Sequence, residues 1–134
     1  MDHEKKVVDL IRNGELVTSH FGFWPSFHDA EVMRVELTRG EGDPALILDL
    51  YAFEMLPEVD ERGVYKLAKR CVVTLACNGC RGLELDGFNE QNVLAQLTIE
   101  PEGELLRVVL HPCYGIWAEF TCERVEVLRV RPLE

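Results

Sequence analysis

The chain has few basic residues. Its 14 Lys and Arg side chains are outnumbered by 24 Asp and Glu side chains, and the formal net charge is −10. A nucleic-acid-binding protein needs a basic surface to displace the counterions of the phosphates, so the charge balance argues against a nucleic-acid partner. It agrees with a basic protein partner, because opposite fields speed encounter, and equally with a role in solubility alone.

The chain also lacks any apolar run close to the roughly 18 residues of a membrane-spanning helix. The segment from Met1 to Lys6 has neither the apolar centre nor the small-residue cleavage site of a signal peptide. These absences predict a cytoplasmic protein without a membrane partner.

Cysteine occurs in an odd number, and the five residues are Cys71, Cys77, Cys80, Cys113 and Cys122. In an intracellular chain this number argues against a disulfide framework. Cys77 and Cys80 have the spacing of a zinc ligand pair, and His111 and Cys113 would have to supply the other two ligands, but no second C-x-x-C or H-x₃₋₅-H is present. A redox C-x-x-C normally opens a helix in a βαβ unit, which the sequence does not predict here. We therefore predict no metal and no cofactor, and keep metal binding by Cys77 and Cys80 as an alternative.

At 134 residues the chain is long enough for one domain with a core of its own, and it contains no repeat, low-complexity stretch or linker. We therefore predict a single domain over residues 1–134. It comprises an N-terminal helix at 3–13, an aromatic junction at 21–29 and a β-rich body at 30–131. The helix has one apolar side at helical spacing, and Gly14 is placed to end it.

The β-rich body shows alternating or continuous apolar runs at 33–38, 45–53, 65–76, 83–88, 97–100, 105–111 and 116–130. We expect an acidic loop at 57–63, a turn at 77–80 and one helical turn at 89–94. A one-residue slip of the apolar pattern near Glu123 predicts a bulge or bend in the last strand. Strands joined by short turns favour antiparallel pairing. The predicted fold is α+β and mostly β, an antiparallel sheet of about six or seven strands with the N-terminal helix packed on one face.

The junction holds the densest chemistry of the chain. Four aromatic rings, those of Phe21, Phe23, Trp24 and Phe27, fall within seven residues and are followed at once by a His-Asp pair. Such rings either anchor the core of a small domain or form an exposed patch that binds a partner.

His28 and Asp29 are the candidates for general acid–base chemistry, because a carboxylate can hold a histidine as a base. A nucleophile is not signalled, since the segment around Ser26 is not a G-x-S-x-G elbow. Adjacent residues of a strand point to opposite faces, so the two side chains are not expected to bond to each other. We predict no catalytic residue; Asp29 caps the turn, His28 satisfies a backbone group, and Trp24, His28 and Asp29 are candidate partner-binding residues.

An acidic run without Lys or Arg extends from Glu41 to Glu61 and comprises Glu41, Asp43, Asp49, Glu54, Glu58, Asp60 and Glu61. One interpretation is a solvated edge that discourages aggregation of the sheet. The other is a docking surface for a cationic partner, with Glu54, Glu58, Asp60 and Glu61 as the candidate contacts.

These residues resemble a known family. The segment from Phe21 to Val32 is similar to the motif near the start of the Immunity protein 50 family, with Trp-Pro-Ser-Phe-His-Asp as its most specific part. Gly87-Phe88-Asn89, Gln91-Asn92-Val93, Tyr114-Gly115 and Cys122 before a Val-rich last strand are also similar, so the resemblance spans nearly the whole chain.

The resemblance implies a mostly β fold and a non-enzymatic immunity protein of a bacterial polymorphic toxin system. Such a protein binds and neutralises a toxin encoded beside it, and the acidic charge suits a basic, nuclease-like toxin. The alternatives are a small enzyme or metal-binding protein, whose side chains at His28 and Asp29, or at Cys77, Cys80 and His111, would have to converge in one pocket, and a structural module without a partner. An exposed edge strand would also permit a homodimer.

Overall fold

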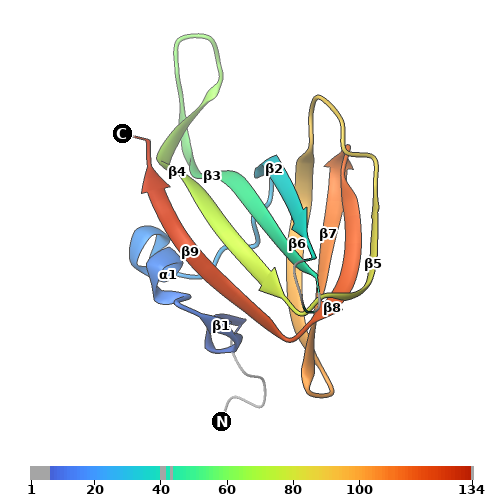
Figure 1. Ribbon diagram of the computed structural model, residues 1–134. Coiled ribbons are helices and arrows are strands. Elements are labelled where there is room, and N and C mark those ends of the chain that lie inside the picture. Colours follow the sequence, from blue (N-terminus) through green and yellow to red (C-terminus); the bar gives the residue numbers. More distant parts are fainter. Residues whose placement is uncertain (1–6, 40–41, 43, 134) are drawn as a thin grey trace.

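A computed structural model describes residues 7–39, 42 and 44–133 as a mostly β protein (Figure 1). Its elements are η1 (Val7–Leu10), β1 (Ile11–Arg12), α1 (Glu15–Phe21), β2 (Glu31–Thr38), β3 (Ala45–Val59), β4 (Tyr65–Asn78), β5 (Arg81–Asp86), β6 (Val93–Glu102), β7 (Leu105–Tyr114), β8 (Trp117–Cys122) and β9 (Arg124–Pro132). The mostly β prediction is confirmed. The described sheet has nine strands rather than six or seven, and it is mixed because β1 pairs parallel with β9. Within the same part of the chain, no helix is long and apolar enough to cross a membrane.

The strands form one open sheet in the order β1-β9-β4-β3-β2-β6-β7-β8-β5. In the described residues, β2 and β6 are paired at Glu31 and Val93 alone. The sheet therefore has two halves, β1 to β2 and β6 to β5, which are joined by a narrow seam. The buried side chains of both halves belong to one hydrophobic core.

Period-two alternation explains the strands well. Along β3, the side chains of Leu46, Leu48 and Leu50 are buried, whereas the residues between them are half-buried and face outward. Isolated hairpins are marginal in water, and packing across a shared apolar core is what stabilises strands of this kind. The alternation therefore fixes which face of β3 enters the core.

The N-terminal helix predicted at 3–13 is wrong within the described residues, and positions 3–6 lie outside them. Val7–Leu10 is one turn of 3₁₀ helix, and Ile11 is buried in a short strand that pairs with Val125 of β9. Gly14 precedes helix α1 instead of ending a helix. The true helix ends at Gly22, whose φ of 91° suits glycine and whose N–H donates to the Thr18 carbonyl at 2.7 Å.

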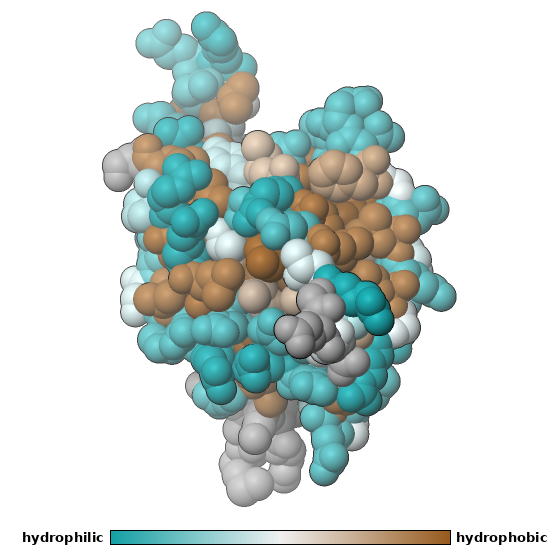
Figure 2. Space-filling view, in the orientation of Figure 1, coloured by the Kyte–Doolittle hydropathy of each residue, from teal (hydrophilic) through white to brown (hydrophobic). Residues whose placement is uncertain are grey.

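The acidic loop predicted at 57–63 is also wrong in part. Strand β3 continues to Val59 and β4 begins at Tyr65, so the loop shrinks to a tight turn. The Asp60 side chain accepts hydrogen bonds from two backbone N–H groups of that turn, at 2.8 and 3.0 Å. Residues 55–67 form a two-stranded hairpin, here called the arm, which projects from the body (Figure 1). Figure 2 shows hydrophilic residues at its tip and hydrophobic residues nearer its base.

Two further predictions change at the other half of the sheet. The helical turn predicted at 89–94 is wrong, because β6 begins at Val93 and the buried Asn92 bonds to loop backbone. The break predicted near Glu123 is confirmed in position, but it separates two strands. Strand β8 pairs with β7 and β5, whereas β9 pairs with β4 and β1, so the chain changes halves there.

Candidate functional site

The junction between α1 and β2 runs along the edge of β6. The Ser26 carbonyl accepts a hydrogen bond from the Leu97 N–H at 2.9 Å, and the Asp29 N–H donates to the Leu94 carbonyl at 2.8 Å. Phe27 and Asp29 adopt positive φ values of 63° and 66°, which side-chain-bearing residues rarely adopt. The bonds to β6 hold this unusual backbone and so fix where the junction side chains point.

The four rings of the junction differ in how deeply they are buried. Phe21 and Phe27 are buried in the core, and Trp24 packs partly buried against it, edge to face with Phe27 at a centroid distance of 5.6 Å. Phe23 is 55% exposed. Core anchoring therefore holds for Phe21 and Phe27, while Phe23 is presented to solvent and Trp24 lies at the boundary.

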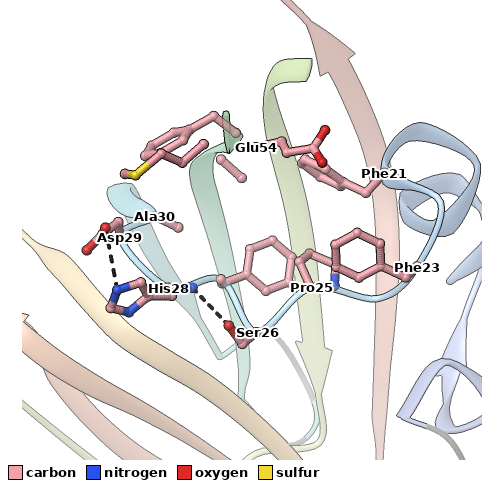
Figure 3. Close-up of a pocket in the computed structure, with 12 residues that line it drawn as sticks. Phe21, Phe23, Pro25, Ser26, His28, Asp29, Ala30 and Glu54 are labelled. Atoms are coloured by element: carbon pink, nitrogen blue, oxygen red, sulfur yellow. Dashed lines mark hydrogen bonds and ion pairs between the residues drawn. The ribbon is translucent and has the colours of Figure 1, made fainter. Parts of the chain in front are cut away.

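A cleft of about 310 Å³ lies between the junction and the base of the arm (Figure 3). Its apolar wall comes from the junction rings on one side and from Ala52, Phe53 and Met55 of β3 on the other. Its polar rim consists of Ser26, His28, Asp29 and Glu54. In Figure 3, His28 and Asp29 lie at one end and Phe21 and Phe23 at the other. An apolar cavity with a few polar groups at its mouth has the composition of a binding site.

His28 and Asp29 approach each other, contrary to the expectation from a strand. His28 Nε2 lies 3.5 Å from Asp29 Oδ2, because Asp29 occupies a left-handed turn rather than an extended strand. His28 Nδ1 lies 3.0 Å from the Ala95 carbonyl, which can only accept, so Nδ1 carries a proton. Nε2 is the nitrogen that faces the Asp29 carboxylate. The expectation that His28 satisfies a backbone group agrees with this geometry.

The arm is tied to the end of α1 at its base. Lys69 Nζ contacts Glu54 Oε1 at 3.3 Å and donates to the Phe21 carbonyl at 3.3 Å. His20 Nε2 lies 2.7 Å from the Lys69 carbonyl, to which it donates. Lys69 has a φ of 56° at an irregularity between β3 and β4. These contacts hold Glu54 at the rim of the cleft.

The predicted partner-binding residues fall into three places. His28, Asp29 and Glu54 meet at the cleft. Trp24 lines a neighbouring hollow with Val7 and Phe23. The other three acidic residues lie farther out on the arm, namely Glu58, Asp60 and Glu61. Phe53 and Met55 were not singled out, because in the sequence they look like ordinary members of an apolar strand.

The cysteines follow a different pattern. Cys77 and Cys80 are buried with Cys122, and Cys80 Sγ donates to the Cys77 carbonyl at 3.3 Å. A hydrogen bond to Cys122, together with burial, raises the pKa of Cys77 well above its usual range, and burial raises the pKa of Cys71 and Cys80 to about 11. His111 bonds instead to Thr98, at 3.1 Å from Nε2 to Oγ1. No group of three or more His, Cys, Asp or Glu side chains able to hold a metal occurs among residues 7–39, 42 and 44–133.

A polar cluster that the sequence did not indicate lies on the outward face of β2, β3 and β4. Asp49 accepts hydrogen bonds from Thr74 Oγ1 at 2.7 Å and from Arg34 Nε at 2.8 Å. Burial alone would raise the pKa of Asp49, but these bonds and the charges of Arg34 and Arg129 outweigh it and lower the pKa. Thr74 is 3% exposed, so its hydroxyl depends on Asp49 rather than water for a hydrogen bond. The cluster therefore stabilises the middle of this half of the sheet.

Comparison with known proteins identifies the family. The family model described as Immunity protein 50 matches residues 13–133, which include the junction, the cleft and every described strand except β1. The chain belongs to the Immunity protein 50 family. Membership implies that the chain is an immunity protein, and it favours a binding role over a catalytic one. A search of curated proteins and a search of solved structures each found no match to the chain.

Proposed function

We propose that this member of the Immunity protein 50 family binds a cognate bacterial toxin inside the producing cell and neutralises it without catalysis. The observation that carries the proposal is the cleft between the junction and the arm, which lies within the segment that matches the family. It combines the exposed ring of Phe23 with carboxylates at its rim. Protein interfaces have this arrangement, an apolar centre enclosed by a polar margin.

The charges support a basic partner. The net charge of −10 would attract a cationic toxin, such as a nuclease, and opposite fields raise association rates. We propose Trp24, His28, Asp29 and Glu54 as contacts around the cleft. Three more carboxylates extend the contact along the arm, those of Glu58, Asp60 and Glu61.

Co-expression with the toxin encoded beside this gene tests the proposal. We expect the chain to restore growth and to copurify with the toxin as a stoichiometric complex. The Asp29→Asn, Glu54→Gln double variant should associate more slowly, and its association rate should depend less on salt. No rescue of growth and no complex would refute the proposal.

A small enzyme is the second candidate, because His28 and Asp29 do meet at the end of a cleft. Titrating the toxin with the purified chain distinguishes the two candidates. Binding predicts complete neutralisation near a one-to-one ratio, whereas turnover predicts neutralisation by a small fraction of that amount. In the enzymatic case His28→Ala abolishes neutralisation, whereas a binding protein loses only affinity.

A further inference from the structure

One face of the arm carries a stripe of four apolar side chains, which we call the arm stripe: Met55, Val59, Tyr65 and Leu67. Met55 is paired directly with Leu67, and Val59 is paired with Tyr65. Directly opposed residues of an antiparallel pair share a face, and so do residues two apart in one strand, as Tyr65 and Leu67 are. An irregularity between Met55 and Val59 inserts extra residues into β3 and returns Val59 to this face.

The arm stripe is open to solvent. Met55 is 48% exposed, Val59 51%, Tyr65 52% and Leu67 37%. Here the sheet has narrowed to two strands, and Figure 1 shows the arm clear of the body. Scattered exposed apolar residues are normal, but a continuous row of them on a projecting ribbon marks an interaction surface.

The arm stripe is continuous with the cleft. Met55 belongs to both, since it begins the stripe and also lines the cleft beside Phe53. Phe23, the exposed ring of the junction, lies in the lining of the same cleft. Cleft and stripe therefore make one elongated apolar surface that runs from the junction onto the arm.

The charges indicate what covers this surface. Glu58, Asp60 and Glu61 lie on the arm with the stripe, as do Arg62 and Lys66, and Glu54 immediately precedes the arm. A second copy of the chain would bring another net charge of −10 against the first, which opposes association of copies. A basic partner meets no such repulsion.

We infer that the arm stripe docks against an apolar patch, flanked by Lys or Arg, on the cognate toxin; this inference rests on the proposed function. Stripe and carboxylates have separate tasks. The apolar side chains lose water on contact and hold the complex together, so they govern dissociation. The carboxylates act at a distance and govern the association rate and its salt dependence.

Binding kinetics with an inactive variant of the toxin encoded beside this gene test the inference. The test variant is Tyr65→Ser, and the control is Phe88→Ser, which removes an equally exposed ring (50%) from the loop between β5 and β6. We expect Tyr65→Ser to dissociate roughly tenfold faster or more, as for an interface hot spot, and Phe88→Ser to stay within about twofold of wild type. Glu58→Gln with Glu61→Gln should slow association and leave dissociation unchanged.

Each result is decisive. If the wild-type chain binds the toxin but Tyr65→Ser and Met55→Ser dissociate at the wild-type rate, the arm stripe is not the contact and the proposed function still stands. If the wild-type chain does not bind, the proposed function fails and the inference fails with it. Sedimentation of the chain alone tests the other occupant, since a dimer that Tyr65→Ser disrupts would assign the stripe to a second copy and overturn the inference. Thermal unfolding of each variant shows whether its fold is intact. Leu67→Ser replaces any stripe variant that unfolds.

Discussion

Replacing the buried Asn92 with alanine is the sharpest test of how the loop before β6 is held to the turn between β7 and β8. The side chain is 3% exposed and makes three hydrogen bonds to backbone. Its Oδ1 accepts from the N–H of Asn89 at 2.8 Å and from the N–H of Ile116 at 3.1 Å. Its Nδ2 donates to the Asn89 carbonyl at 2.7 Å. One amide thus joins the loop before β6 to the turn between β7 and β8.

The cost follows from the groups that Asn92→Ala leaves without partners. Ile116 is 0% exposed, so water cannot replace the lost bond to its N–H, whereas Asn89 is exposed and can be rehydrated. A buried donor without a partner costs about 1–3 kcal/mol, and each rehydrated group costs less. We expect the free energy of unfolding to fall by about 2–4 kcal/mol, a large part of the roughly 5–15 kcal/mol of a typical domain.

Urea unfolding followed by circular dichroism measures this change. The midpoint should shift by about 1–2 M urea for a slope of about 2 kcal/mol/M. The control is Asn89→Ala, which removes a neighbouring amide whose Oδ1 accepts from the N–H of Glu90 in the exposed loop. We expect that variant to lie within about 0.5 kcal/mol of wild type. Equal midpoints for Asn92→Ala and Asn89→Ala would refute the claim that the Asn92 bonds hold the loop and the turn together.

Three further predictions concern the backbone, the charges and the thiols. Gly115→Ala should destabilise more than Gly103→Ala in the same urea assay: both residues have positive φ (79° and 62°), but a Cβ at 115 would lie 2.3 Å from the Gln91 carbonyl oxygen, whereas the space at 103 is open. Equal losses would show that φ alone matters. Asp49→Asn should lower the free energy of unfolding at pH 7 by about 1–3 kcal/mol. This difference from wild type should disappear as the pH falls below about 4 and through the lowered pKa of Asp49, because protonation then removes the same charge from the wild-type protein. A difference that does not change with pH would contradict this. A thiol reagent at pH 8 should label Cys113 first in the native protein, since the other four cysteines are buried, and mass spectrometry of the labelled peptides would expose a second fast thiol if one exists.

Much of the strand structure could be predicted, because alternation is a local signal. The buried side chains of Leu46, Leu48 and Leu50 were visible as every second residue of one run, and the break at Glu123 was visible as a slip in that pattern. Cys77–Cys80 was predicted as a turn, and the chain does turn there, with Gly79 at a φ of 71°. These features depend on residues that are neighbours in the chain.

The N-terminus could not be predicted in this way. The apolar residues from Val7 to Ile11 fit a helix by spacing, but Ile11 pairs with Val125, far away in the sequence. Glycine is compatible with either end of a helix, and only the packing of Ile11 places Gly14 before α1. Tertiary contacts outweighed local propensity here.

The sequence indicated where the candidate site lies but not which residues come together to form it. The junction stood out by its composition, yet which rings are buried depends on the bonds from Ser26 and Asp29 to β6. Phe53 and Met55, the opposite wall of the cleft, carry no local signal. The contact between His28 and Asp29 depends on the left-handed φ of Asp29, which residue order alone does not specify.

Local chemistry therefore determined the strands, the acidity and the family, since these follow from residue type and short-range order. The tertiary structure alone brought residues 87–92 against the turn at Gly115, through the buried amide of Asn92. It likewise set the base of the arm beside the junction and left the arm stripe uncovered. The physical reason is that the walls of the cleft come from segments far apart in the sequence. These segments meet only when the two halves of the sheet bury a common core.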